Sequence, residues 1–383
     1  MKEMANSAIL IYGMGGLGIE IAKNIALAGV KNLTIQDCKL AEIQDLGTQF
    51  FLREEDVGKN RAEASSSRLA ELNPYVSLSA LKTGLDCDSD LSYLAGYQCV
   101  ILTEAPLKVQ ICVNNFCRQQ TPQIKFISAD VFGVCCGAFC DFGDNFEITD
   151  LDGEEPKEIF IEKISKGKPG VVSCFKNKMH GFDTGDHVTF REINGMTALN
   201  VLSPYMFEIC DTTGEEFAPY KHGGIARQVK VSQNASFKSL EQEILNPSLL
   251  IPDLCRFEAP ANIHLGFLAL HRFNEKFKRF PKAWCVEDSS NLVSLAKGLN
   301  TELTNKVTTI DEDLLNVLSY TNTGCLSPLC AALGGFVAQE GIKAVTGKFT
   351  PLKQWLYLDC RDVINKEEAA TPDMFTPRLV KHG

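Results

Sequence analysis

Near its N-terminus the chain reads Ala8-Ile-Leu-Ile-Tyr12 and continues directly as Gly13-Met-Gly-Gly-Leu-Gly18. A short, largely apolar segment that ends in a cluster of glycines is typical of a buried strand running into a tight turn. The residues after this turn follow a helical period, and Gly29 marks the end of that helix. The sequence therefore predicts a strand, a glycine-rich turn and a helix, which together form the first unit of an α/β fold.

The glycine-rich turn also has the spacing of a nucleotide site. Gly13, Gly15 and Gly18 fit the pattern G-x-G-x-x-G, and Gly16 adds a fourth glycine. Such glycines let the backbone approach a phosphate, whose charge the N-terminus of the following helix stabilises. Asp37 ends the next apolar segment, where an acid that binds a ribose hydroxyl is expected. Nucleotide binding is one interpretation of this turn; glycines that only permit close packing of strand and helix are the other.

Outward from the turn, the pattern changes along the chain. Up to residue 143, strands and helices alternate, which predicts a parallel sheet covered by helices. From 144 to 233, short strand-like segments alternate with turns, which predicts a small β domain. The range 250–324 carries amphipathic stripes and is predicted to be a helical bundle. Three later features are a helix that begins at Ser327-Pro328, a final strand from Gln354 to Leu358 whose bulky residues suit a sheet interior, and a polar tail at 363–383.

Composition limits the classes of partner and of chemistry. The 383 residues are 45% hydrophobic and 22% charged, as in globular proteins, and the net charge of −10 argues against nucleic acid as the main partner. The most apolar segment, Leu326 to Val345, contains Gln339, Glu340 and Lys343, so a buried helix is expected rather than a membrane span.

The reactive side chains form no recognisable catalytic or metal-binding pattern. The 15 cysteines include no C-x-x-C pair, which favours free thiols in a reducing compartment. The six histidines do not cluster at ligand spacing, and the motifs G-x-x-x-x-G-K-[ST], H-E-x-x-H and G-x-S-x-G do not occur. We therefore expect no catalytic residue and no metal site.

A series of motifs, in order along nearly the whole chain, resembles the N-terminal half of the ubiquitin-activating enzymes. The motifs are Gly13–Gly18, Asp45–Phe51, Phe126–Asp130, Phe139–Gly143, Pro169–Val172, Thr184–Asp186, Gly195-Met196, Gly334-Gly335, Ala338–Glu340, Gly347–Phe349 and Gln354–Tyr357. The resemblance implies a Rossmann-like fold of the ThiF and MoeB type. It also implies a pairing of two similar nucleotide-fold domains, of which the second binds ATP and Mg²⁺ and adenylates the C-terminus of the modifier. A cysteine domain of the family then holds the modifier as a thioester.

By this resemblance the chain carries the inactive member of the pair. The inactive adenylation domain would comprise 1–143 and 325–362, the first catalytic-cysteine half-domain 144–233, and the inserted bundle 250–324. Despite its name, that half-domain lacks the nucleophile.

Loss of catalysis is expected from three positions. Lys39 stands where the active domain has a second Asp, and Thr48 stands where it has an Arg. The run Thr103–Pro106 does not match the metal-binding Asp of the active domain. A Lys and a Thr cannot supply the charges that Asp and Arg give to Mg²⁺ and phosphate. The predicted nucleotide-binding residues are therefore expected to be vestigial: Gly13, Gly15, Gly16, Gly18 and Asp37.

The leading hypothesis is a scaffold and modifier-contacting part of a ubiquitin-activating enzyme, present as a fragment, a short isoform or a partial gene model, and inactive alone. Its expected partners are ubiquitin or a ubiquitin-like modifier, an active adenylation domain in cis or in trans, and conjugating enzymes through the full-length protein. Neither nucleic acid nor a membrane is expected as a partner. The cytoplasm is the expected compartment, with the nucleus as a second one.

Two alternatives stay open from the sequence. The first is a non-catalytic binding module that pairs with a separate active subunit. The second is an NAD-dependent oxidoreductase, motivated by the glycine-rich turn and Asp37.

Overall fold

The computed structural model describes residues 3–175, 178–190, 193–215, 220–221 and 223–364, and the chain divides into two compact units. Unit 1 comprises Met1–Phe146, Ala235–Thr346 and Pro351–Gly383, and unit 2 comprises Glu147–Asn234 and Gly347–Thr350. From residue 365 onward, the predicted tail lies outside the described residues.

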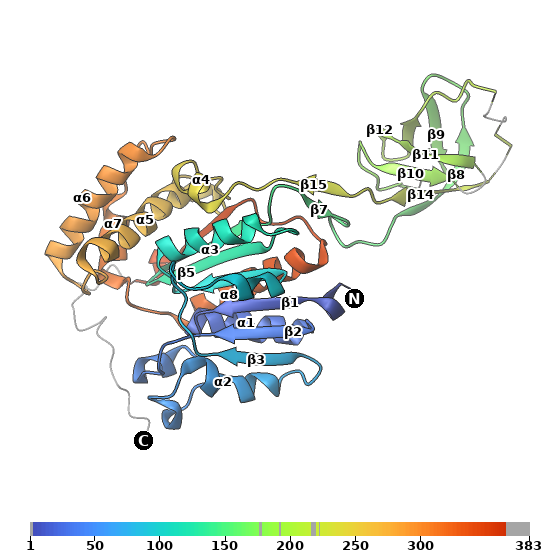
Figure 1. The fold of residues 1–383 in the computed structure, drawn as a ribbon. Coiled ribbons are helices and arrows are strands. Elements are labelled where there is room, and N and C mark those ends of the chain that lie inside the picture. The colour runs from blue at the N-terminus through green and yellow to red at the C-terminus, as the bar shows by residue number, and fades with distance from the viewer. Residues whose placement is uncertain (1–2, 176–177, 191–192, 216–219, 222, 365–383) are drawn as a thin grey trace. The chain divides into compact units, whose positions relative to one another are not determined.

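Unit 1 is built on a seven-stranded sheet with the order β16-β6-β5-β4-β1-β2-β3 (Figure 1). Its strands are β1 (Ala8–Tyr12), β2 (Asn32–Gln36), β3 (Ser77–Leu81), β4 (Cys99–Thr103), β5 (Lys125–Phe132), β6 (Cys135–Asp141) and β16 (Trp355–Asp359). Strands β3, β2, β1, β4 and β5, which are neighbours in this order, are parallel, as predicted. β6 pairs antiparallel with β5 and with β16, so the sheet is mixed. β1 lies between β2 and β4, which makes its carboxyl end the switch point where doubly wound folds bind ligands.

Helices lie on both faces of this sheet, and α6 and α7 pack on α5 rather than on the sheet. The helices of unit 1 are α1 (Gly16–Ala28), α2 (Arg61–Ala70), α3 (Leu107–Gln119), α4 (Leu240–Leu245), α5 (Ala259–Phe277), α6 (Val286–Glu302), α7 (Glu312–Thr321) and α8 (Ser327–Thr346). Val100 of β4 belongs to the core that α3 covers. The next residue, Ile101, faces the opposite layer, because a Cβ on Gly341 of α8 would lie 3.3 Å from it. In that layer α8 packs along α1.

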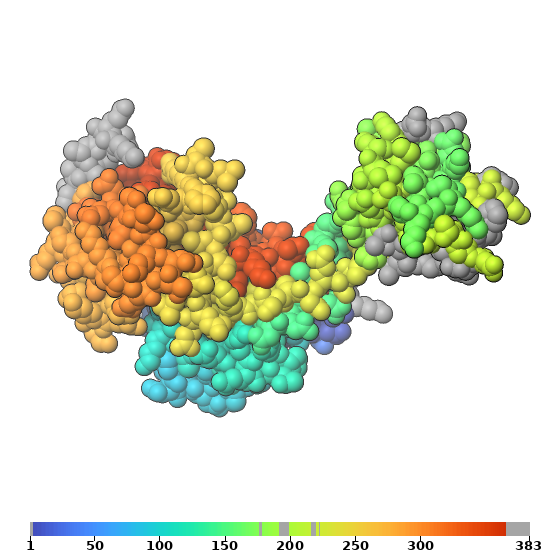
Figure 2. Space-filling model, turned by 90° about the horizontal axis from the view of Figure 1, so that it is seen from above, coloured from blue at the N-terminus to red at the C-terminus, as the bar shows by residue number. Residues whose placement is uncertain are grey.

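The helices predicted as a separate bundle at 250–324 pack within unit 1 and share its core. Phe267 of α5 contacts two aromatic rings of the sheet, with centroids 4.9 Å from Phe132 and 5.4 Å from Tyr357. Figure 2 shows the yellow segment that contains α4 lying against the cyan segment of α3, and the two helices are in contact. The amphipathic stripes of the bundle are therefore buried partly against the sheet.

The prediction that Gln354–Leu358 suits a sheet interior is wrong, because β16 is an edge strand. β16 pairs with β6, and α5 covers its bulky side chains. The Tyr357 hydroxyl lies 2.8 Å from Nδ1 of the buried His264 on α5. Burial by a helix thus explains the apolar composition that suggested a second strand neighbour.

Unit 2 is a β unit with its own core. Its seven-stranded sheet has the order β11-β10-β14-β8-β9-β13-β12 and antiparallel pairing. The strands are β8 (Glu158–Ile164), β9 (Gly170–Cys174), β10 (His187–Phe190), β11 (Ile193–Ala198), β12 (Asn200–Ser203), β13 (Met206–Ile209) and β14 (Ile225–Val229). Val172, Val188 and Phe207 are fully buried in this core. A separate ladder joins β7 (Phe146–Ile148) and β15 (Gln233–Ala235).

Within the described residues, no helix combines the length and the apolar composition that crossing a bilayer requires.

Candidate functional site

The glycine-rich turn, Gly13–Gly18, lies at the carboxyl end of β1 and leads into α1. Gly13 has φ +88°, a conformation that favours glycine, and its N–H donates to the Gln36 carbonyl at 2.8 Å. The Thr103 hydroxyl donates to the Gly13 carbonyl at 2.8 Å. A Cβ on Gly18 would overlap that same carbonyl. Close packing alone therefore requires glycine at positions 13 and 18.

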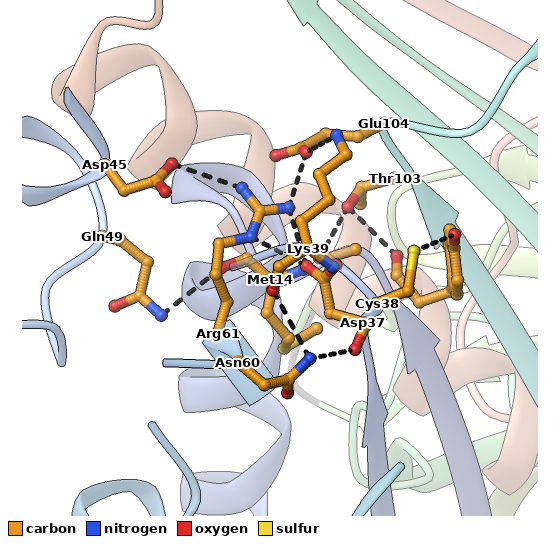
Figure 3. Close-up of polar contacts among 12 residues, drawn as sticks. Met14, Asp37, Cys38, Lys39, Asp45, Gln49, Asn60, Arg61, Thr103 and Glu104 are labelled. Atoms are coloured by element: carbon orange, nitrogen blue, oxygen red, sulfur yellow. Dashed lines mark hydrogen bonds and ion pairs between the residues drawn. The ribbon is translucent and has the colours of Figure 1, made fainter. Parts of the chain in front are cut away.

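Asp37 lies at the predicted place beside this turn, but protein groups occupy its carboxylate (Figure 3). Its Oδ2 accepts from the Met14 N–H at 2.6 Å and from Nε and Nη2 of Arg61 at 2.9 and 2.7 Å. Its Oδ1 accepts from the Lys39 N–H at 2.8 Å. Asp37 is 1% exposed, so this acid is a buried structural partner rather than a free acceptor for a ribose.

Arg61 is the centre of the ionic contacts around the turn. It is the first residue of α2, after Asn60, which caps the helix and also donates to the Asp37 carbonyl at 2.7 Å. All three guanidinium nitrogens donate to carboxylates: besides the bonds to Asp37, Nη1 lies 3.3 Å from Asp45 Oδ1 and Nη2 lies 2.8 Å from Glu104 Oε2. Burial opposes the charge of Arg61, but Glu104, Asp37 and Asp45 together raise its pKa above the ordinary value.

Glu104 closes the turn from the side of β4. It directly follows that strand and has φ +54°, in the left-handed region that residues other than glycine rarely adopt. Its Oε2 also accepts from Lys39 Nζ at 2.7 Å. Burial alone would raise the pKa of Glu104, yet the charges of Arg61 and Lys39 outweigh burial and hold this pKa below its usual value. Glu104 is therefore a carboxylate anion at neutral pH.

The position of Glu104 decides whether a nucleotide fits. A Cβ on Gly15, the N-cap of α1, would overlap Oε1 of Glu104. The carboxylate thus lies over the helix N-terminus, in the space that the glycines would leave for a phosphate. A second anion there would meet like charge, while both neighbouring cations are already paired. The residues present do not fit an ATP triphosphate with Mg²⁺.

Thr48 stands where the active adenylation domain of the ubiquitin-activating enzymes, by the resemblance, has an Arg. It lies beside the turn at Gly16. Its Cβ would be 2.8 Å from a Cβ on Gly16, so the short, uncharged Thr48 side chain packs directly against the turn. Among the described residues, no group of three or more His, Cys, Asp or Glu has the arrangement of a metal site.

The sequence predicted the turn and Asp37 but missed Arg61 and Glu104. These two residues form an ionic network with Asp37, Lys39 and Asp45, which we call the Arg61 network. The sequence contained one signal for Arg61 and one for Glu104. A cation in the first turn of a helix opposes the helix dipole and therefore indicates a charged partner. Glu104 ends a strand at the ligand-binding edge of a parallel sheet, where polar residues usually serve a site.

Comparison with known proteins assigns the family. A model described as the ThiF family matches residues 1–369. The chain belongs to the ThiF family. It is 49% identical over 387 residues to ubiquitin-like modifier-activating enzyme 6 of Homo sapiens, covering 99% of this chain and 36% of that protein. It is 43% identical over 389 residues to ubiquitin-like modifier-activating enzyme 1 of Oryctolagus cuniculus, again covering 99% of this chain and 36% of the relative.

These identities confirm the resemblance to ubiquitin-activating enzymes, and the identity to enzyme 6 exceeds the identity to enzyme 1. This member of the ThiF family spans about a third of the length of the curated relatives it matches. Among solved structures, E. coli MccB with ATP is 22% identical with a TM-score of 0.32, covering 36% of this chain and 40% of that chain. A similarity this low supports no argument about the site.

Proposed function

We propose that this chain is the scaffold and modifier-contacting part of an ATP-dependent enzyme that activates ubiquitin or a ubiquitin-like modifier. The full enzyme would adenylate the C-terminus of the modifier and carry it as a thioester. The observation that carries the proposal is the Glu104 carboxylate over the glycine-rich turn, held by Arg61 and Lys39. This chain alone would neither bind ATP productively nor adenylate a modifier.

One face of α8 supports the pairing with an active adenylation domain, in cis or in trans. Leu329, Leu333 and Val337 are buried against unit 1. An apolar, small-residue face at the start and middle of the helix is exposed to solvent; it comprises Ala331, Ala332, Gly335 and Phe336 of α8 and Leu326, which directly precedes the helix. Phe336 is 50% exposed, and a Cβ on Gly335 would meet nothing within 4 Å. A smooth apolar helix face of this kind suits close packing against another domain.

Unit 2 supports the modifier contact. Its surface exposes large apolar side chains, including Phe160 at 60%, Met179 at 68% and Leu202 at 48%. Exposed side chains of this size are enriched where one protein binds another. We propose that the modifier contacts this surface of unit 2 and that conjugating enzymes bind the full-length protein. The proposed compartment is the cytoplasm, with the nucleus as a second one.

The catalytic part of the proposal is tested by pyrophosphate exchange. The chain is incubated with ubiquitin, ATP and labelled pyrophosphate, and separately with a complete modifier-activating enzyme as positive control. We expect no incorporation of label into ATP by the chain alone. Turnover by the purified chain at the rate of the complete enzyme would refute the scaffold assignment.

The pairing is tested by capture of a separately produced active adenylation domain from ubiquitin-like modifier-activating enzyme 6. We expect retention by the immobilised chain, and loss of retention in Phe336→Asp. The matched control is Phe160→Asp, which places the same charge on an exposed ring of unit 2. Equal retention by both variants would contradict docking on α8.

The Arg61 network also argues against the oxidoreductase alternative. A dinucleotide needs both the turn for its pyrophosphate and the acid for its ribose. In this chain the Glu104 carboxylate lies over the turn, and Arg61 pairs with the acid, Asp37. Titration of NADH should therefore leave its fluorescence unchanged.

A further inference from the structure

Two cysteines at the start of α8 lie in direct contact. Cys325 precedes the helix, Cys330 lies in its first turns, and their Sγ atoms are 3.2 Å apart. Cys330 is fully buried, whereas Cys325 is an exposed residue. The pair lies beside the glycine-rich turn, because Cys330 Sγ would be 3.3 Å from a Cβ on Gly16. The two sulfurs are thus already in contact, with no other group between them, as a disulfide partner requires.

The surroundings differentiate the two thiols. The hydrogen bond with Cys330 lowers the pKa of Cys325, burial opposes this effect, and a further hydrogen bond with Thr48 lowers the pKa again. For Cys330 the same hydrogen bond and burial both raise the pKa. Cys325 is therefore the more acidic of the two thiols and the one that forms the reactive thiolate more readily.

We propose that Cys325 and Cys330 are a peroxide-reactive dithiol that closes into an intramolecular disulfide. In the first step the Cys325 thiolate attacks hydrogen peroxide, which breaks the O–O bond, forms a sulfenic acid and releases hydroxide. In the second step the Cys330 sulfur attacks the sulfenic sulfur, and the departing hydroxyl leaves as water with the proton of Cys330. Peroxide is the oxidant: it accepts two electrons, and two thiols become one disulfide.

The other thiols of the described residues are less suited to this reaction; in the second neighbouring pair, burial and Cys87 raise the pKa of Cys112. Cys99, Cys135 and Cys140 are buried, and burial raises the pKa of each, which suppresses the reactive thiolate. Cys255 is exposed, but among the described residues no second thiol lies in contact with it. Cys325 combines access, a lowered pKa and a resolving partner.

The experiment is mass spectrometry of the full chain after limited treatment with hydrogen peroxide, alkylation of the remaining thiols and digestion with trypsin. The tryptic peptide 307–343 contains Cys325 and Cys330 and no other cysteine. We expect this peptide to appear unalkylated and lighter by two hydrogen atoms, and to be restored by a reducing agent. Full alkylation of this peptide while thiols elsewhere are oxidised would overturn the proposal.

Three variants separate the roles. Cys330→Ser should stop at the sulfenic acid on Cys325, which dimedone traps. Cys325→Ser should leave Cys330 reduced. The control Cys255→Ser should form the disulfide at the rate of the unmodified chain. Dimedone labelling on Cys330 in the Cys325→Ser variant would refute the assignment of the two sulfurs. None of these readouts depends on nucleotide or partner binding.

Discussion

Arg61 stabilises unit 1 by neutralising carboxylates that would otherwise be buried or crowded without a partner. We predict that Arg61→Ala lowers the free energy of unfolding by about 3–5 kcal/mol, the usual cost of leaving a buried charge unpaired. The larger part of this loss comes from Asp37, whose side chain is 2% exposed. Denaturant unfolding of the chain, followed by circular dichroism, measures the change.

Lys82→Ala is the matched control, because Lys82 pairs with Glu63 in an exposed ion pair. Its expected cost is at most about 1 kcal/mol. Equal losses for the two variants would show that the Arg61 network contributes no more than a surface pair.

In the proposed function the Glu104 carboxylate keeps the phosphates of ATP out of the turn, so its removal should admit them. In Glu104→Ala, Arg61 and Lys39 would lose a shared carboxylate and face the N-terminus of α1. We expect this variant to bind ATP more tightly than the unmodified chain, measured by equilibrium dialysis with labelled ATP. Glu63→Ala, which removes an exposed carboxylate from the same helix as Arg61, should bind as the unmodified chain does. Identical binding by all three would contradict the role of Glu104.

At the scale of the element, α8 contains two adjacent glycines with opposite surroundings. A Cβ on Gly334 would lie 2.7 Å from Glu20 Cβ on α1, so Gly334→Ala should destabilise by about 1–3 kcal/mol through overpacking. A Cβ on Gly335 would meet open space, so Gly335→Ala should stabilise by up to about 1 kcal/mol through helix propensity. Thermal unfolding of both variants checks the pair. Destabilisation by both would mean that the outer face of α8 is already packed in the isolated chain.

The packing of α5 on β16 predicts a pH dependence. His264 accepts from the Tyr357 hydroxyl at Nδ1, and its Nε2–H donates to the Ile244 carbonyl at 3.0 Å. Burial lowers the pKa of His264 to about 4. Between that value and the ordinary pKa of about 6.5, the unfolded chain binds the extra proton, so stability falls as the pH falls.

The expected loss from His264 is about 2 kcal/mol between about pH 7 and about pH 5, since one pKa unit corresponds to about 1.4 kcal/mol. Urea unfolding at both pH values gives the loss. His264→Gln removes the titrating group and should flatten this part of the curve. Parallel curves for the variant and the unmodified chain would contradict the buried, neutral His264.

What the sequence could predict follows from the range of the interactions. β1, the turn and α1 were predicted correctly because glycine spacing and hydrophobic period are local signals. The pairing of Arg61 with Glu104 could not be predicted, because it joins residues 43 positions apart and requires a positive φ at Glu104. The edge position of β16 was missed for a similar reason, since α5 supplies the burial that its composition requires.

At the scale of the whole molecule, the chain spans about a third of the length of its curated relatives. It forms two units with separate cores. Unit 1 has the fold and the switch point of a nucleotide-binding domain. Its own side chains fill the turn at that point. A domain of this kind is suited to hold partners in place, and the proposed scaffold role rests on that contrast between fold and site.

The most direct measurement is isothermal titration calorimetry of the 383-residue chain with ATP and Mg²⁺. The filled turn predicts no saturable heat of binding at ATP concentrations that saturate a complete modifier-activating enzyme. Stoichiometric, saturable binding of one ATP by the unmodified chain would contradict the account.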